Sequence, residues 1–374
     1  METALRALLK WVAGILIVLV MLCLLPAVYI HGACQSGGIP VRSNDQSKLP
    51  APIVQALRET KQWRRPEADS FLTYPEWYIV YTSRDYARYL ADHTASGFRY
   101  FASVLGFWTS YCEMNRYAAA RYPFSKDAHI TDYVIGISHS AEFILRGIYE
   151  NTVGRLTELF GPGATTAEEK FAQGYWTDYG NFLNTTPWYD YPYGDRQREL
   201  WHAVSRDGPG WLRKWERRLA LSAEFSIKGA YAKLLGGGAK AAFEPALPTT
   251  VAVVERLPQS ILSEFPKVKV LAQSGSTSLV SFPRYAPFTE IVQRMAESGA
   301  VFTEIAGNRT ILVTTAVKPG MRIPERSARE LFRTDLLAGD GGSRVGLAVP
   351  VELLLDVVRE FKRQSQPIEH VYDY

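Results

Sequence analysis

The chain has few cysteines and no block of like charge. It contains only three cysteines in 374 residues, and no two of them have the Cys-x-x-Cys spacing of zinc or iron–sulfur sites. Its 42 basic and 38 acidic residues are spread along the sequence, without the lysine- and arginine-rich tracts of nucleic-acid-binding proteins. We therefore expect no metal site and no nucleic-acid partner.

Motifs that bind phosphate or create a strained nucleophile are also missing. The segment LLGGGAK (234–240) lacks the Gly-Lys-Ser/Thr ending of a phosphate-binding loop. The segment GISHS (136–140) has a serine where a nucleophile elbow needs its second glycine, and it lies within a helical pattern, so Ser138 is interpreted as an ordinary helix residue. These absences exclude the common cofactor and hydrolase signatures, and we expect no cofactor.

One long apolar segment dominates the N-terminus. Residues 11–30, WVAGILIVLVMLCLLPAVYI, are twenty residues without a charge, enough to cross a bilayer core of about 30 Å. Arg6 and Lys10 precede the segment and favour a cytoplasmic N-terminus. The alternative is a cleaved signal peptide, but the apolar region of such a peptide is usually only about 7–15 residues. We predict an uncleaved anchor over residues 1–34, in contact with the lipid bilayer through residues 11–30.

The segment after the anchor is predicted to be a tether. Residues 35–52 are polar and interrupted by glycine and proline, which is typical of a linker. Cys23 lies within the predicted span, which leaves Cys34 and Cys112 in a compartment where disulfides form. The sequence leaves open whether these two cysteines form a bridge or remain two buried thiols.

The rest of the chain predicts an α+β protein with two domains. From residue 53 to 243 the apolar residues follow a helical period, and near Thr249 the pattern changes to short β-branched segments typical of strands. From Ser278 the expected order is strand, helix, strand, strand, helix, strand, which is the order of a ferredoxin-like domain. We therefore predict a helical domain over 53–243 and a ferredoxin-like α+β domain over 249–374.

The helical domain contains a duplicated segment. Residues 140–154, SAEFILRGIYENTVG, and residues 222–236, SAEFSIKGAYAKLLG, are identical at seven of fifteen positions. In each copy a glutamate precedes a cation by four residues, the favoured direction for a helix ion pair, and a glycine follows the cation. The favoured interpretation is a pair of similar helices that pack closely through their glycines, each with its own ion pair.

The alternative interpretation is that the two glutamates work together. Glu142 and Glu224 would then be a carboxylate pair, with His139 one helical turn before Glu142 as a further catalytic candidate. A carboxylate-bridged di-iron site is disfavoured, because it needs Glu-x-x-His on two helices and the chain offers a single His-x-x-Glu in reversed order. The sequence alone does not choose between scaffold and site.

Two aromatic segments are candidates for ligand binding. PEWYIVY (75–81) includes Trp77 and Tyr78, and PWYDYPY (187–193) includes Trp188 and Tyr189. Such clusters can line a lipid or sugar pocket, or they can form an ordinary helical core with tyrosines at its rim. The apolar stretch 98–112 is too short to span a bilayer and is interpreted as a core or interfacial helix.

Several segments of the chain resemble a family of bacterial membrane-anchored proteins of unknown function. The resemblance is carried by TYPEWYIVYTSRDYARYL, GIYENTVGRLTE, TPWYDYPYG and the C-terminal IEHVYDY, and it covers most of the chain after the anchor. It implies the bacterial inner membrane, one N-terminal anchor and a large periplasmic portion. It implies no activity and no catalytic residues.

These observations favour a single-pass envelope protein that binds or scaffolds at the periplasmic face of the membrane. Its C-terminal domain would bind a protein partner or a second copy of the chain. The alternative function is a lipid-handling protein or envelope enzyme that uses His139, Glu142 and Glu224 in an aromatic-lined cavity.

Overall fold

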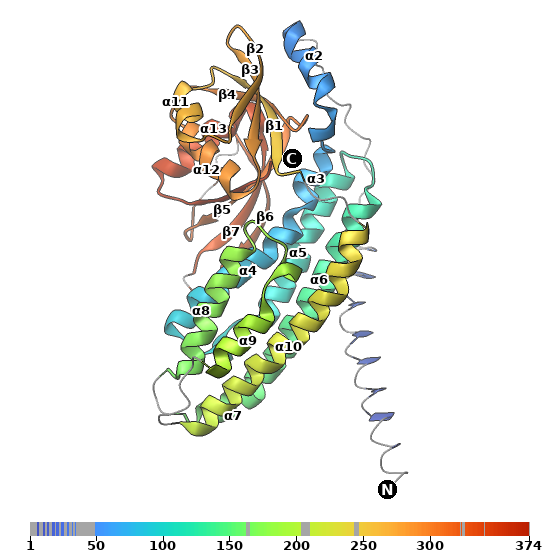
Figure 1. Ribbon diagram of the computed structural model, residues 1–374, viewed down its shortest axis with the longest axis vertical. Helices are drawn as coiled ribbons and strands as arrows, with labels where there is room; N and C mark the ends of the chain where they lie inside the picture. Colours follow the sequence, from blue (N-terminus) through green and yellow to red (C-terminus); the bar gives the residue numbers. More distant parts are fainter. Residues whose placement is uncertain are drawn as a thin grey trace.

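The computed structural model describes residues 49–161, 165–202, 210–242, 247–321, 323, 326–339 and 341–373, with scattered positions between Arg6 and Cys34. The fold is α+β, as the sequence predicts, with a helical bundle and two antiparallel sheets in the C-terminal part. The sheets lie at one end of an elongated bundle (Figure 1).

The bundle is formed by helices of very different lengths. The principal ones are α3 (Glu67–Leu72), α4 (Tyr74–Asp92), α5 (Tyr100–Ala119), α6 (Lys126–Tyr149), α7 (Arg155–Glu158), α8 (Ala167–Phe182), α9 (Tyr193–His202) and α10 (Trp211–Ala242). A short π-helical segment, η4 (Glu150–Gly154), connects α6 to α7 without a break. α6 and α10 therefore run most of the length of the bundle (Figure 1).

Local sequence explains where several of these helices begin. Pro75 occupies the first turn of α4, where a missing N–H is tolerated, as the sequence predicts. α8 begins with a capping box: the Thr166 side chain accepts a hydrogen bond from the Glu169 N–H, and the Glu169 carboxylate accepts one from the Thr166 N–H. The capping box fixes the first turn of α8.

The C-terminal part forms two four-stranded antiparallel sheets. The first has the order β2-β3-β1-β4 and the second has the order β6-β7-β5-β8. The strands of the first sheet are β1 (Thr249–Glu255), β2 (Lys269–Ser274), β3 (Thr277–Pro283) and β4 (Val301–Ile305). Those of the second sheet are β5 (Thr310–Val317), β6 (Arg329–Asp335), β7 (Ser343–Pro350) and β8 (Ile368–Val371).

This topology corrects the expected domain from Ser278. The prediction combined β3, β4, β5 and β8 in one sheet, whereas the structure places β3 and β4 in the first sheet and β5 and β8 in the second. The predicted elements are present, but two further strands, β6 and β7, lie between β5 and α13 (Leu354–Arg363), so the expected order is wrong. Strand pairing joins residues distant in sequence, and a local pattern does not contain that information.

The two sheets enclose a shared core with two helices between them. Helices α12 (Ala286–Met295) and α13 (Leu354–Arg363) contribute Phe288 and Phe361 to an apolar cluster that also contains Val254 of β1 and Val313 of β5. A third helix, α11 (Gln259–Glu264), lies at the edge of this core and contributes one buried isoleucine. Alternate strand residues point to the opposite faces of the sheets.

The outer faces of the two sheets are covered by the N-terminal half of the chain. Helix α2 (Ala51–Glu59) buries Ile53 and Leu57 against the first sheet. The bundle covers the second sheet: the Tyr81 hydroxyl lies 2.6 Å from the Thr314 hydroxyl, and the buried Asp85 forms an ion pair with Arg344 at 3.3 Å. Helix α4 thereby joins the bundle to the sheets.

The predicted anchor and tether lie mostly outside the residues that the structure describes. The predicted span 11–30 is described only at scattered positions, where large apolar side chains such as Trp11 and Val28 are exposed, and residues 35–48 of the predicted tether lie outside the described part. Among the helices formed by the described residues, none combines the length and the apolarity needed to cross a bilayer.

Candidate functional site

The two copies of the duplicated segment face each other in antiparallel orientation. Three contacts join α6 to α10: Ser138 with Tyr231 at 2.9 Å, Glu142 with Lys228 at 2.8 Å, and Arg146 with Glu224 at 2.7 Å. Residue numbers rise along one helix as they fall along the other. The antiparallel repeat therefore places the glutamate of each copy opposite the cation of the other.

The four charges of the repeat form one compact group, here termed the charge quartet: Glu142, Arg146, Glu224 and Lys228. The two contacts within each helix, Glu142–Arg146 and Glu224–Lys228, are both 3.2 Å, as the helix spacing predicts. The two contacts between helices are shorter, at 2.8 and 2.7 Å. Each carboxylate therefore contacts a cation of its own helix and a cation of the other helix.

Aromatic side chains of α8 cover the buried side of the quartet. The ring centre of Trp176, which is almost fully buried, lies 4.8 Å from the Arg146 guanidinium and 4.6 Å from the Lys228 ammonium. The Tyr175 hydroxyl donates a hydrogen bond to Glu224 at 3.3 Å. Cation–π contacts of this kind strengthen in a desolvated site, so α8 fixes the quartet from a third side.

The quartet holds Glu224 and Lys228 in their charged forms. Burial alone raises the pKa of Glu224, but the charges of Arg146 and Lys228 outweigh it and lower the pKa to about 2. Burial alone lowers the pKa of Lys228, but Glu142 and Glu224 raise it above its ordinary value. A carboxylate with so low a pKa is a poor general base, and a lysine with so high a pKa is a poor nucleophile.

His139 does not join the quartet. Its imidazole is buried between the rings of Phe107 and Phe143, and its Nε2 lies 3.1 Å from the Ser103 hydroxyl. Burial lowers the pKa of His139 to about 4, although the nearby Glu142 acts in the opposite direction. The ring is therefore neutral at physiological pH and contributes to the core between α5 and α6.

The two glycines of the repeat play different roles. A Cβ at Gly147 would lie 2.9 Å from the Cβ of Tyr100, so this glycine permits the close approach of α6 and α5. A Cβ at Gly229 would lie 3.6 Å from the Cβ of Tyr193, which is an ordinary contact. The prediction that the two copies pack on each other through their glycines is therefore wrong: Gly147 faces α5 and Gly229 has room for a side chain.

The four aromatic candidates lie in two separate places. Trp77 stacks on His370 of the second sheet with ring centres 3.5 Å apart, and the Tyr78 hydroxyl donates to the Ser103 carbonyl at 2.8 Å. Trp188 stacks on Tyr231 of α10 at 5.3 Å and contacts Tyr189 edge-on at 5.9 Å. The structure does not bring the two pairs together.

A second buried charge network was missed at the sequence level. Arg213, Arg217 and Arg218 of α10 are almost fully buried, and Arg217 and Arg218 pair with Glu150 at 2.7 Å and Glu168 at 2.6 Å. The sequence WLRKWERRL resembles a solvated basic segment, because burial is not visible in local composition. The repeated pairing of arginine with glutamate across helices is known only from the tertiary structure.

The π-helical turn positions one member of this network. The extra residue in η4 (Glu150–Gly154) rotates the helix so that Glu150 faces α10. A Cβ at Gly154 would lie 2.5 Å from the Glu150 carboxylate, so a larger residue there would require this side chain to shift. The YENTVG segment therefore serves the packing of α6 and α7 against α10.

The outward side of the same helix pair is apolar. We term it the outer face; its members are Ile130, Val134, Leu145 and Ile148 of α6 and Leu219, Ile227 and Leu234 of α10, all exposed. At about 100° per residue, these positions lie opposite the residues that face the bundle core. Because α6 and α10 are adjacent, joined by the contacts Glu142–Lys228 and Arg146–Glu224, both apolar stripes lie on the same side of the bundle.

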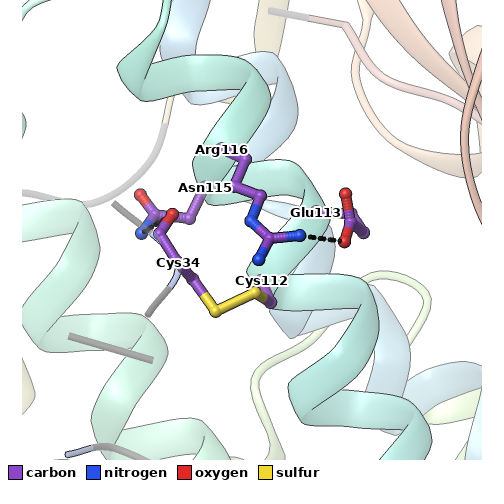
Figure 2. Close-up of a disulfide and its surroundings, with 5 residues drawn as sticks. All are labelled: Cys34, Cys112, Glu113, Asn115 and Arg116. Atoms are coloured by element: carbon purple, nitrogen blue, oxygen red, sulfur yellow. Dashed lines mark hydrogen bonds and ion pairs between the residues drawn. A yellow bond between two sulfur atoms is a disulfide. The ribbon is translucent and has the colours of Figure 1, made fainter. Parts of the chain in front are cut away.

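A disulfide ties the end of the anchor region to this bundle. Cys34 and Cys112 of α5 are bonded across a sequence separation of 78 residues, and the Cys34 carbonyl accepts a hydrogen bond from Asn115 at 3.5 Å (Figure 2). The sequence left bridge and free thiols open, and the structure has the bridge. The neighbouring Tyr111 donates to or accepts from His129 at 2.7 Å, which places the bridge near the start of α6.

The chain matches no protein-family model, no curated protein and no solved structure. Within the described part of the chain, no group of three histidine, cysteine, aspartate or glutamate residues is arranged to hold a metal ion. The site is therefore interpreted from its geometry alone, as a compensated ionic contact that joins three helices.

Proposed function

We propose that the protein is a single-pass, membrane-anchored envelope protein that binds or scaffolds at the periplasmic face of the bacterial inner membrane. The observation that carries the proposal is the Cys34–Cys112 disulfide, which begins four residues after the uncharged segment 11–30. A structural disulfide fits an oxidising compartment such as the periplasm. The resemblance of the aromatic segments to bacterial membrane-anchored proteins supports the same location.

The disulfide limits how far the body can lie from the membrane. Cys34 is four positions after Ile30, and an extended chain spans at most about 3.5 Å per residue, so Cys34 lies within about 14 Å of the end of the anchor. The bond to Cys112 adds a Cα–Cα distance of 5.2 Å and holds this part of α5 near the same point. The part of the body around Cys112 is then close to the membrane.

The C-terminal part is proposed to contain two ferredoxin-like units in tandem. In each sheet the third strand of the unit lies between the second and the first, and the fourth strand lies outside the first, which is the strand order of a split βαβ unit. The first unit has both helices, α11 and α12; the described residues between β5 and β6 form no helix, so the second unit has α13 alone. Folds of this kind serve many roles, and we assign this part to binding a protein partner or a second copy.

The quartet argues against the alternative of an envelope enzyme or lipid-handling cavity. Glu142 and Glu224 are each held by two cations, and His139 is enclosed by Phe107 and Phe143 without contact to either carboxylate. The two glutamates and the histidine therefore serve the packing of the bundle. The function supported best is therefore a non-enzymatic one.

The proposal is tested by the topology of the full chain in a bacterial host. Alkaline phosphatase fused after Tyr374 is expected to be active, because that enzyme requires the oxidising periplasm, and the fusion is expected to remain in membranes after carbonate extraction. Non-reducing electrophoresis is expected to show the bridge in wild type and its loss in Cys112→Ser. An inactive fusion, or a protein extracted by carbonate, would contradict the proposal.

A further inference from the structure

We infer that the outer face of α6 and α10 is a lipid-docking surface, inserted into the periplasmic leaflet of the membrane that holds the anchor. This inference rests on the proposed function and extends it, because it assigns a second membrane contact to the folded body. The ligand is the acyl and headgroup boundary of the bilayer.

The residues that α6 exposes to solvent support the inference. From Ile130 to Tyr149, every exposed residue of this helix is apolar: Ile130, Val134, Leu145 and Ile148. The charged residues in the same stretch are turned inward, toward the core or toward α10. A helix at the surface of a soluble protein normally carries charged and polar residues on its exposed side.

Helix α10 repeats the pattern. Its exposed residues between 211 and 234 are almost all apolar: Trp211, Leu212, Trp215, Leu219, Ala223, Ile227, Ala230 and Leu234, with Ser226 and Lys233 as the two polar exceptions. α6 and α10 lie side by side along the bundle (Figure 1). The result is a continuous apolar surface of two helices, larger than the scattered apolar residues that need no explanation.

The charge quartet adds no net charge to this face. Glu142, Arg146, Glu224 and Lys228 neutralise one another at the seam between the helices, so no net charge is presented outward. From Ile130 to Ile148 the face extends about 27 Å at 1.5 Å per residue. A long apolar surface on two neighbouring helices suits a helix pair lying in the plane of the membrane interface.

The position of the anchor identifies lipid as the occupant. The bridge places the Cα of Cys112 in α5 5.2 Å from that of Cys34, which itself lies within about 14 Å of the anchor's end. Tyr111, next to Cys112, contacts His129, next to Ile130, so the face begins close to the bridge. The described anchor positions Trp11, Ile17 and Val28 are themselves 75%, 64% and 68% exposed and do not cover the face.

The test separates the body from the anchor in the full-length protein. A protease site is inserted between Gly37 and Ser47, and the protein is reconstituted into vesicles of phosphatidylethanolamine and phosphatidylglycerol with the body outside. Cleavage leaves the body attached through the disulfide, and a reductant then removes the last covalent link. We expect the wild-type body to remain with the vesicles after both steps.

Charged substitutions on the face supply the decisive comparison. Leu145→Glu with Ile227→Glu is expected to move the cleaved, reduced body into the supernatant, with a loss of vesicle binding of about tenfold or more per substitution. The matched control is Leu271→Glu on β2, another exposed apolar residue. It is expected to leave binding unchanged, and circular dichroism checks that all variants fold.

The outcomes distinguish this inference from the proposed function. Release of the wild-type body on reduction, with retention before reduction, would overturn lipid docking and leave the anchored topology intact. Failure of the uncleaved protein to enter vesicles would contradict the proposed function itself. Retention of the body as a cross-linkable dimer that survives in detergent without lipid would assign the face to a second copy and overturn the inference.

Discussion

Glu142 of α6 lies 2.8 Å from Lys228 of α10, closer than the 3.2 Å to Arg146 on its own helix. The duplicated sequence therefore works as a reciprocal pair, because Arg146 likewise lies 2.7 Å from Glu224 on the opposite helix. Each copy has a glutamate four residues before a cation, and the antiparallel arrangement places the glutamate of one copy beside the cation of the other. The repeated glutamates hold α6 and α10 together.

Removing one cation of the quartet is expected to destabilise the fold. Lys228→Met keeps the aliphatic stem but leaves Glu142 without its nearest cation, and we expect the free energy of unfolding to fall by about 3 kcal/mol. Denaturant unfolding in detergent measures the change. The control is Lys233→Met, an exposed position of α10, with an expected change below about 0.5 kcal/mol.

A double substitution tests whether the effect is one of pairing. Glu142→Gln together with Lys228→Met removes both members of one contact and retains Arg146 with Glu224. The double variant is expected to lose at least about 1 kcal/mol less than the sum of the two single variants. Additive losses would show that the contact between the helices is not coupled.

The two repeat glycines provide a matched pair. Gly147→Ala is expected to lower stability by about 1–3 kcal/mol, because the new methyl group would lie 2.9 Å from the Tyr100 Cβ. Gly229→Ala has room, with its nearest neighbour at 3.6 Å, and is expected to raise stability by up to about 1 kcal/mol through helix propensity. Thermal unfolding measures both variants. A Gly147→Ala variant more stable than Gly229→Ala would contradict this assignment.

His139 is expected to make the protein sensitive to mild acid. Burial lowers its pKa from 6.5 to about 4, so between these values the unfolded chain binds a proton that the folded chain does not, and stability falls as the pH falls. The full effect is about 3 kcal/mol. His139→Gln is expected to flatten the stability profile between pH 6.5 and 4, and an unchanged profile would refute the buried neutral ring.

Glu224 is expected to act in a lower pH window. Its pKa falls from 4.5 to about 2 because Arg146 and Lys228 outweigh the effect of burial, so its contribution is complete above pH 4.5 and is lost as the pH falls toward 2. The loss is about 3 kcal/mol. Glu224→Gln is expected to be less stable at neutral pH and to show a shallower decline below pH 4.5, measured by denaturant unfolding at each pH.

Among the interactions tested, the disulfide is expected to contribute most to the free energy of unfolding. A loop of 78 residues corresponds to about 4.5 kcal/mol in the chain-entropy model, so Cys112→Ser is expected to lower the free energy of unfolding by up to this amount. Cys23→Ser is the control and is expected to change neither stability nor mobility on a non-reducing gel. Equal stability of Cys112→Ser and wild type would show that the bridge has no structural role.

Local sequence determined the features that depend on periodicity and composition. The change from helical to strand pattern near Thr249, the start of α4 at Pro75 and the ion-pair spacing within each repeat copy were predictable. These properties arise within one or two turns of helix or one strand, where neighbouring residues in the chain are also neighbours in space. The uncharged segment 11–30 is of the same kind.

Tertiary structure decided everything that depends on which segments meet. The division of the strands between two sheets, the burial of Arg213, Arg217 and Arg218, and the bond between Cys34 and Cys112 all join residues far apart in the chain. The same holds for the quartet, where each glutamate has two cations at similar spacing and only the antiparallel approach of α6 and α10 brings the second within 3 Å. Pairing and burial are set by the surroundings of a side chain, and local sequence does not specify them.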